Sequence, residues 1–305
     1  MHRQDSNGGT RRWTPLVAGV VTALLCTFVA VAAPAPATAA LPGAAVRSQQ
    51  SHPFSSEPTR AVAAYCPEGT RVTGGGGRVD GNPDHVVLTR MRPVHTNNLD
   101  RFEVAAAEDE AGTSLAWTVT AIAICASPID GMEIASETHV GGDSLYNYAF
   151  VTCPTGKLPI GGGGQITGGK GQVHLGYMRD QYSHSTLASG LEDANGFDGN
   201  WTVTGYAVCV PIPPPGSTRT VAVHSEVDSE NPKEVTATCP DGMSVTGVYG
   251  ISFGNGDRNA VLQSVAPAAL PGGLPGREVT GVARENNPIP PDKEWSVTAM
   301  ASCHR

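Results

Sequence analysis

Three pairs of acidic or amide residues recur shortly before a tryptophan, at a spacing of nine or ten residues. The pairs are Glu108-Asp109, Glu192-Asp193 and Glu285-Asn286, and the tryptophans that follow them are Trp117, Trp201 and Trp295. Oxygen ligands of this kind bind calcium or accept hydrogen bonds from sugar hydroxyls. A turn that precedes a strand requires the same residue types. We therefore interpret the pairs as turns first and as a candidate ligand loop second.

Two serines lie within strings that match hydrolase motifs. Gly142-Asp143-Ser144-Leu145 matches the block that names the GDSL-type esterases, and Gly250-Ile251-Ser252-Phe253-Gly254 matches the nucleophile elbow. Such an elbow leads into a helix and needs a nearby base, whereas strand patterning surrounds both serines and no Asp-x-x-His occurs in the chain. We therefore predict no catalytic residue, cofactor or metal site. A secreted serine hydrolase or esterase using Ser144 or Ser252 is the alternative.

The candidate residues belong to a unit that is repeated three times. Each copy contains Cys-Pro-x-Gly, a glycine cluster, a leucine 22 or 23 residues after the first cysteine, and a tryptophan eight residues before the second cysteine. The cysteines that open and close the copies are Cys66 and Cys125, Cys153 and Cys209, and Cys239 and Cys303. Such a period indicates one supersecondary unit in tandem, so we predict β repeats over residues 59–128, 129–212 and 213–305.

The six cysteines of the repeats allow fifteen pairings in principle. Because a duplicated unit most simply duplicates its own bond, we predict Cys66–Cys125, Cys153–Cys209 and Cys239–Cys303. Each bond would close a loop of about 60 residues and contribute roughly 4 kcal/mol in the chain-entropy treatment. Zinc binding would require clustered spacings such as Cys-x-x-Cys, which the chain does not contain.

The N-terminal segment and the charge balance indicate where the protein works. Arginines precede an apolar run over residues 16–33, and the small-residue sequence Ala37-Thr38-Ala39 follows. We interpret residues 1–40 as a cleaved signal peptide rather than a membrane anchor, and residues 41–58 as a flexible linker. Secretion to the extracellular space would let the disulfides persist. Of 20 basic and 28 acidic residues, 17 and 27 lie after residue 40, and this net charge of about −10 disfavours nucleic acid as a partner.

Residue periodicity predicts an all-β protein with about five strands in each copy. In the last strand of a copy, alternate residues are the tryptophan, small apolar residues and the second cysteine, which is typical of a face packed closely against another sheet. The expected architecture is three tandem, disulfide-stapled antiparallel β repeats. They would form either a pseudo-threefold, β-prism-like body or three small sandwiches or barrels.

The glycine clusters at residues 74–77 and 161–164 are candidates for a phosphate loop. Neither Lys-Ser/Thr nor a helix start follows them, so the phosphate-loop interpretation fails. The third copy has Gly247-Val248-Tyr249-Gly250 instead, so side chains are partly tolerated there. We interpret the clusters as a β-bulge or as a close backbone approach to the tryptophan.

The pattern Cys-Pro-x-Gly-x4-Gly-Gly-Gly followed by Trp-x-Val-x5-Cys resembles a repeat of secreted actinobacterial and phage-associated proteins, over about residues 61–305. The resemblance implies export and a disulfide-stapled β unit, with no agreed activity. The threefold arrangement is similar, in architecture only, to the β-prisms of vitelline outer-layer proteins and jacalin-like lectins. We predict a non-catalytic protein that binds a glycan or an extracellular surface through loops presented once per copy. An extracellular protease inhibitor presenting residues 266–275 is a weaker alternative.

Overall fold

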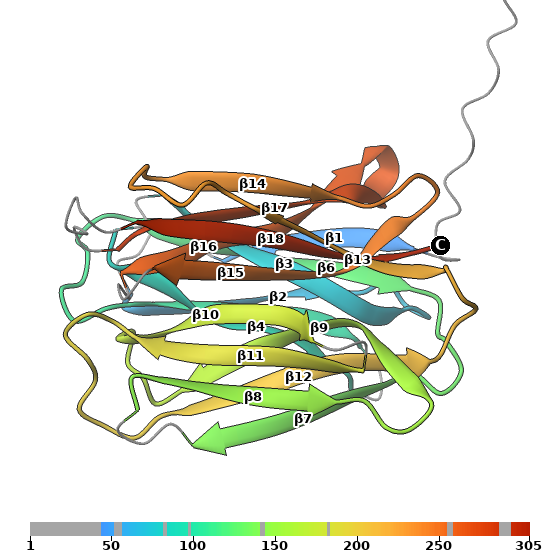
Figure 1. Ribbon diagram of the computed structural model, residues 1–305, viewed down its shortest axis with the longest axis horizontal. Helices are drawn as coiled ribbons and strands as arrows, with labels where there is room; N and C mark the ends of the chain where they lie inside the picture. Colours follow the sequence, from blue (N-terminus) through green and yellow to red (C-terminus); the bar gives the residue numbers. More distant parts are fainter. Residues whose placement is uncertain are drawn as a thin grey trace, which may run out of the picture. The chain divides into compact units, whose positions relative to one another are not determined.

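Antiparallel β-strands make up nearly all of the regular structure in the computed structural model of this chain (Figure 1). The structure describes residues 44–51, 57–81, 84–96, 99–140, 144–181, 184–254, 259–286 and 294–305. The predicted signal peptide lies outside these residues. All of the described residues belong to one compact unit that begins at Pro36, so the three repeats do not separate into domains of their own.

Within the described residues each copy has six strands, one more than predicted, because a further strand precedes the opening strand. Copy 1 contains β1 (Ala45–Gln50), β2 (Thr59–Tyr65), β3 (Arg71–Gly81), β4 (Val86–Val94), β5 (Arg101–Glu108) and β6 (Trp117–Ala126). Copy 2 contains β7 (Glu133–Val140), β8 (Tyr146–Thr152), β9 (Lys157–Thr167), β10 (Val173–Gln181), β11 (Ser185–Glu192) and β12 (Thr202–Pro211). Copy 3 contains β13 (Thr218–His224), β14 (Lys233–Thr238), β15 (Ser244–Gly254), β16 (Ala260–Leu270), β17 (Leu274–Glu285) and β18 (Trp295–His304). β1 lies within the segment predicted to be a flexible linker.

Every sheet combines one half of a copy with one half of another copy. Sheet A has the strand order β1-β6-β3-β16-β17-β14, sheet B has β2-β5-β4-β9-β12-β7, and sheet C has β13-β18-β15-β10-β11-β8. The copies join where a glycine-rich strand pairs with the leucine strand of another copy, at β3–β16, β9–β4 and β15–β10. We call these three junctions the seams 1/3, 1/2 and 2/3. Because the joins close into a cycle, the repeats form a pseudo-threefold, β-prism-like body and not three separate sandwiches.

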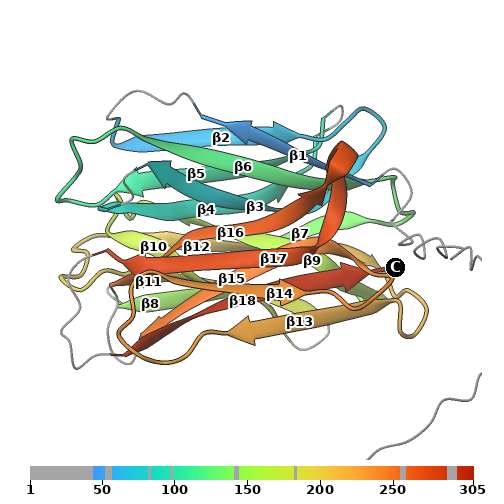
Figure 2. The ribbon, with the colours of Figure 1, turned by 90° about the horizontal axis from the view of Figure 1, so that it is seen from above.

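The three disulfides pair as predicted, each within its own copy. Cys125 lies in β6 of sheet A, whereas Cys66 directly follows β2 of sheet B. The opening strand and the tryptophan strand of a copy therefore belong to different sheets, and the disulfide joins those sheets. The edge strands of the two sheets contact each other in each copy, as Figure 2 shows for β1 and β2.

The tryptophans anchor one continuous hydrophobic core. Trp117, Trp201 and Trp295 are at most 1 % exposed, and all three belong to a single cluster of buried residues that draws on every copy. The small residues and the cysteine that alternate with each tryptophan are buried on the same face. This confirms the strand face that the sequence predicts.

The glycine clusters pack against the backbone of another copy, so their predicted approach to the tryptophan is wrong. A Cβ atom on Gly74 would lie 2.4 Å from the carbonyl oxygen of Thr246, and one on Gly161 would lie 2.1 Å from that of Thr73. A Cβ atom on Gly247 would lie 2.5 Å from the Cα atom of Gly161. The three glycine-rich strands thus meet on the pseudo-threefold axis at a distance that excludes any side chain. The predicted bulge is present in all three copies, in β3 beside Gly74, in β9 beside Gly161 and in β15 beside Gly247.

The third copy tolerates Tyr249 because its seam is more open. At seam 1/2 the two strands pair at two positions, and a Cβ atom on Gly163 would lie 2.0 Å from the Met91 carbonyl oxygen. At seam 2/3 the strands pair only at Tyr177 and Ile251. Tyr249, which occupies the position of Gly163, is buried there with its ring against Gly162.

Residues 266–275, the segment of the inhibitor alternative, form a hairpin whose tip is exposed at residues 269–272. β16 and β17 continue their pairing to Leu270 and Leu274, and only the 3-10 turn η1 (Pro271–Gly273) connects them. The hairpin contacts β1 beside seam 1/3.

Candidate functional site

The first residue of each predicted ligand pair supports a tryptophan. Glu108 accepts a hydrogen bond from the Trp117 indole Nε1 at 2.9 Å, and Glu192 accepts one from Trp201 at 3.0 Å. Glu285 accepts one from Trp295 at 3.3 Å. The second carboxylate oxygen of Glu108 and of Glu192 accepts a backbone N–H of the following turn. These glutamates hold the tryptophan and the turn in place. A ligand could bind their carboxylate oxygens only if these hydrogen bonds were broken.

The second residue of each pair is buried where the three turns meet. Asp109, Asp193 and Asn286 are at most 7 % exposed, and the Asn286 side-chain amide donates to the Asp109 carboxylate at 2.8 Å. Burial raises the pKa of the Asp193 carboxyl to about 7, and the neighbouring Glu110 and Asp109 carboxylates add to the shift. The pairs therefore do not form solvent-facing loops. Among the described residues, no group of three or more His, Cys, Asp or Glu side chains has the geometry to hold a metal ion.

The two serines occupy unlike positions in the fold. Ser144 is exposed just before β8, and Ser252 is 2 % exposed inside β15 with strand on both sides. Within the described part of the chain, no hydrogen bond joins either serine to a histidine, and the Ser252 hydroxyl is buried without a hydrogen-bond partner. The Gly142 and Asp143 positions of the first motif lie outside the described residues.

A row of aromatic side chains covers the edge strand β8. Tyr146, Tyr148 and Phe150 alternate with inward residues and are 65 %, 45 % and 44 % exposed. The rings of Tyr148 and Phe150 contact each other edge to face, with centroids 5.0 Å apart. We call these three residues the aromatic row. Exposed apolar surface is costly in water, and a contiguous patch of it is a candidate interaction site.

On the outer face of sheet C, further apolar and aromatic side chains extend from the aromatic row towards the middle of the sheet. Strand register places Leu187 beside Phe150 and Leu191 beside Tyr146. Further along the same face, the ring of Tyr177 packs edge to face against Phe253, with centroids 6.3 Å apart. Partial burial on this face raises the pKa of the Tyr177 hydroxyl. We call this surface, together with the aromatic row, the aromatic face.

The other copies do not repeat the aromatic row. The positions of Tyr146, Tyr148 and Phe150 are occupied by Thr59, Ala61 and Ala63 in β2 of copy 1, and by Pro232, Glu234 and Thr236 in copy 3. β2 and β14 nevertheless occupy the same edge position in their sheets as β8 does in sheet C. The fold therefore does not require aromatic side chains on this strand.

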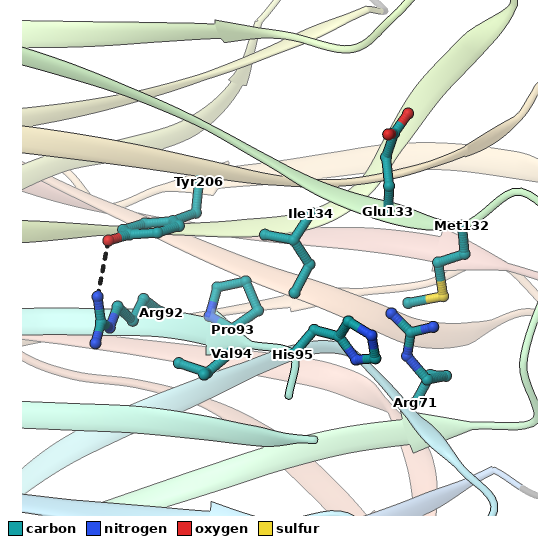
Figure 3. A pocket seen from close by; sticks show the side chains of 9 residues that line it. All are labelled: Arg71, Arg92, Pro93, Val94, His95, Met132, Glu133, Ile134 and Tyr206. Carbon is teal, nitrogen blue, oxygen red and sulfur yellow. Dashed lines mark hydrogen bonds between the residues drawn. The ribbon is translucent and has the colours of Figure 1, made fainter. Parts of the chain in front are cut away.

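A groove lies across seam 1/2 on the outer side of sheet B, with a volume of about 450 Å³. Strands of two copies line it: β3 and β4 of copy 1 supply Arg71 and Arg92, and β7 and β12 of copy 2 supply Ile134 and Tyr206. Figure 3 shows Arg92 hydrogen-bonded to the Tyr206 hydroxyl at one end and Arg71 beside His95 at the other. We call this cavity the seam groove.

The equivalent position at seam 2/3 holds a smaller groove of about 200 Å³. Thr220 takes the place of Ile134 in its wall, and Met300 takes the place of Tyr206 in the tryptophan strand. The position is therefore a repeated feature of the fold, while the chemistry at each seam differs.

The sequence contains signals for parts of both surfaces. The string Tyr146-Asn147-Tyr148-Ala149-Phe150 alternates aromatic and smaller residues, which is typical of a strand with one aromatic face. Charged residues alternate in the same way at Arg90 and Arg92 and at Arg101 and Glu103. Such alternation indicates which side chains share a strand face, whereas catalytic motifs carry no such information.

No protein-family model matches the chain, and no curated protein sequence matches it. Within the described residues, no helix has the length and apolar character needed to cross a bilayer.

Proposed function

We propose that this chain is a secreted, non-catalytic binding protein that holds a glycan or a polymer of an extracellular surface on its aromatic face. The observation that carries the proposal is the aromatic row: three rings, each about half exposed, on one edge strand. The other two copies do without these rings, so ligand binding explains them better than folding does.

The chemistry of the aromatic row suits a neutral saccharide chain. A sugar ring presents C–H bonds on its faces and hydroxyls at its edges, and an aromatic ring offers a negative face to such C–H bonds. The hydroxyls of Tyr146 and Tyr148 add hydrogen-bonding groups to the row, and no side chain of the row carries a charge. Alternate residues of a strand recur every 6.6 Å or so, which gives the row a length of roughly 13 Å. That length suits several units of a polymer.

The support of the row is rigid, which lowers the entropic cost of binding. β8 pairs with β11 over seven residues, and Cys153, which follows β8, is linked by a disulfide to Cys209 of β12. Aromatic side chains have only two rotatable bonds, so little side-chain freedom is lost when a ligand covers them.

The proposal is tested with the secreted, oxidised protein and a panel of neutral polysaccharides: cellulose, chitin and a soluble β-glucan. We expect one of them to bind, and we expect Tyr148→Ala and Phe150→Ala each to weaken that binding about tenfold or more, as truncation of central aromatic contacts does. Tyr65→Ala is the matched control, because Tyr65 is 52 % exposed at the end of β2, outside the row. The row variants should unfold at the same temperature as the parent protein.

Two outcomes would contradict the proposal. One is the absence of binding to every polymer of the panel, and the other is equal binding by the parent and by the triple variant of Tyr146, Tyr148 and Phe150. A fluorophosphonate probe addresses the hydrolase alternative. We expect no labelling of the folded protein, whereas stoichiometric labelling that Ser144→Ala or Ser252→Ala removes would favour an enzyme.

A further inference from the structure

The seam groove carries an excess of positive charge on an otherwise acidic protein. Next to the groove, the carboxylate of Glu103 is surrounded by three guanidinium groups. Its distances to Arg90, Arg92 and Arg101 are 3.8, 2.8 and 2.7 Å. Burial alone would raise the pKa of the Glu103 carboxyl, but hydrogen bonds from Arg92 and Arg101 lower it, so the carboxylate is ionised. One negative charge against three positive charges leaves a net charge of two at this end.

A buried aspartate holds Arg71 and His95 at the other end of the groove. Asp100 is 4 % exposed and accepts hydrogen bonds from Arg71 Nε at 2.8 Å and from the Val72 backbone N–H at 2.9 Å. Its other oxygen lies 2.6 Å from His95 Nδ1. Among the described residues, Arg71 contacts Asp100 through its Nε atom and not through its terminal NH₂ groups. The two terminal NH₂ groups of that guanidinium, which lines the groove, are therefore available to a ligand.

The acidic residue that borders the groove is directed away from it. Figure 3 shows the Glu133 carboxylate pointing away from Arg71 and His95, and its oxygen lies 2.5 Å from Lys157 Nζ. Between the two cationic ends, Pro93, Val94 and Ile134 form an apolar stretch. The groove thus presents a guanidinium group at each end, Arg92 and Arg71, and apolar surface in the middle.

We propose that the seam groove is a second binding site, distinct from the aromatic face, for a saccharide that bears carboxylate groups. The planar guanidinium fork matches a carboxylate through two parallel hydrogen bonds. The apolar stretch accommodates the C–H face of a sugar ring between two acidic groups. The local charge of the groove, opposite in sign to that of the whole chain, selects an anion from its surroundings.

The test measures binding of a fluorescently labelled trigalacturonate, with its methyl ester as the neutral control. We expect the acid to bind at least tenfold more tightly than the ester, and the difference to shrink between 50 mM and 500 mM salt, because salt screens charge attraction. Equal affinity for acid and ester would overturn the proposal. Tighter binding of a linear tetraphosphate than of trigalacturonate would overturn the assignment to carboxylates.

A charge-reversal pair at Ile134 locates the site without disturbing any ion pair. Ile134→Glu and Ile134→Lys remove the same apolar contacts but place opposite charges in the middle of the groove. We expect Ile134→Glu to weaken trigalacturonate binding at least tenfold and Ile134→Lys to preserve or strengthen it. Equal losses in both variants would contradict the proposal.

Two further variants keep the test informative. If the Ile134 variants do not fold, Tyr206→Phe replaces them. It removes the hydrogen bond to Arg92 at 2.9 Å and should weaken binding threefold to fivefold, whereas unchanged binding would count against the site. Tyr148→Ala on the aromatic face should leave trigalacturonate binding unchanged, so failure of this proposal and failure of the proposed function are separable.

Discussion

The three copies contact one another at both ends of their strands, and the two contact regions consist of different groups. At the glycine end, Gly74, Gly161 and Gly247 bring backbone against backbone on the pseudo-threefold axis. At the carboxylate end, the side chains of Asp109 and Asn286 meet, and Asp193 lies beside Glu110. All three copies keep glycine at the first end, whereas the second end has two acids and one amide.

The difference shows what a repeat can change without losing its fold. A backbone contact at the glycine end leaves no room for a side chain, so all three copies have glycine there. A side-chain contact at the carboxylate end tolerates any residue that satisfies its hydrogen bonds, so the copies diverge there. The resulting group of carboxyls makes the stability of this end depend on pH, whereas the glycine end contains no titratable contact.

The largest expected effect is at the glycine end. Gly161→Ala places a Cβ atom 2.1 Å from the Thr73 carbonyl oxygen, and neither backbone can move without breaking its sheet. We expect a loss of more than about 3 kcal/mol of unfolding free energy, or no secretion of folded protein. Gly216→Ala is the control: nothing lies within 4 Å of its Cβ position, and its φ of +79° costs only about 1–2 kcal/mol. Equal stability of the two variants in urea unfolding would show that the axis is not tightly packed.

Truncation of a core tryptophan should have an effect nearly as large. Trp201 is 1 % exposed and its indole nitrogen donates to Glu192, so Trp201→Ala leaves both a cavity and an unpaired buried carboxylate oxygen. We expect a loss of about 3–5 kcal/mol and poor secretion. A change of less than about 0.5 kcal/mol, typical of exposed positions, would mean that the strand face is reversed.

At the carboxylate end, Asp193→Asn should stabilise the protein at neutral and alkaline pH. The folded-state pKa of about 7 exceeds the ordinary value of 3.8, so the folded state favours the protonated carboxyl. Its contribution to stability is complete below about pH 4 and is lost as the pH rises through 7. We expect a gain of about 2–4 kcal/mol at pH 8 and little change at pH 4.

Urea unfolding of the Asp193→Asn variant and the parent protein across this pH range checks that prediction. The charged groups that face the carboxyl are Glu110 and Asp109, and both are retained in the variant. The exposed Asp198→Asn is the matched control and should give no pH-dependent difference of that size. A stability difference between variant and parent that does not change with pH would refute the assignment.

The smallest expected effect concerns the glutamate that supports Trp201. In Glu192→Gln, the amide oxygen can still accept the indole N–H, but its NH₂ group faces the Phe197 backbone N–H, which now donates to the carboxylate. The loss of one accepted hydrogen bond should cost about 1 kcal/mol. Chemical unfolding gives the energy, and the indole N–H resonance of Trp201 shows whether its hydrogen bond survives. A loss as large as that of Trp201→Ala would mean that the turn and the tryptophan cannot be separated.

Part of the candidate site was predictable and part was not. The sequence identifies Glu108, Glu192 and Glu285 because a repeat displays them at a common offset, but it cannot say that their oxygens face the tryptophans. The assembly of the seam groove from two copies was beyond prediction. Arg92 and Tyr206 lie 114 residues apart and meet only because β4 of copy 1 joins β9 of copy 2.

The sequence by itself determined the units of this protein: an all-β chain, three copies, three disulfides within copies and a buried tryptophan face. These features depend on composition, on alternation along a single strand and on equal spacing, all of which are local or periodic in the chain. Only the tertiary structure decided how the copies share their sheets, why the glycines are required and which side chains of different copies line a common groove. Those features depend on pairing between copies, and strand pairing is set by the fit of whole sheets around a common core, which no single segment encodes.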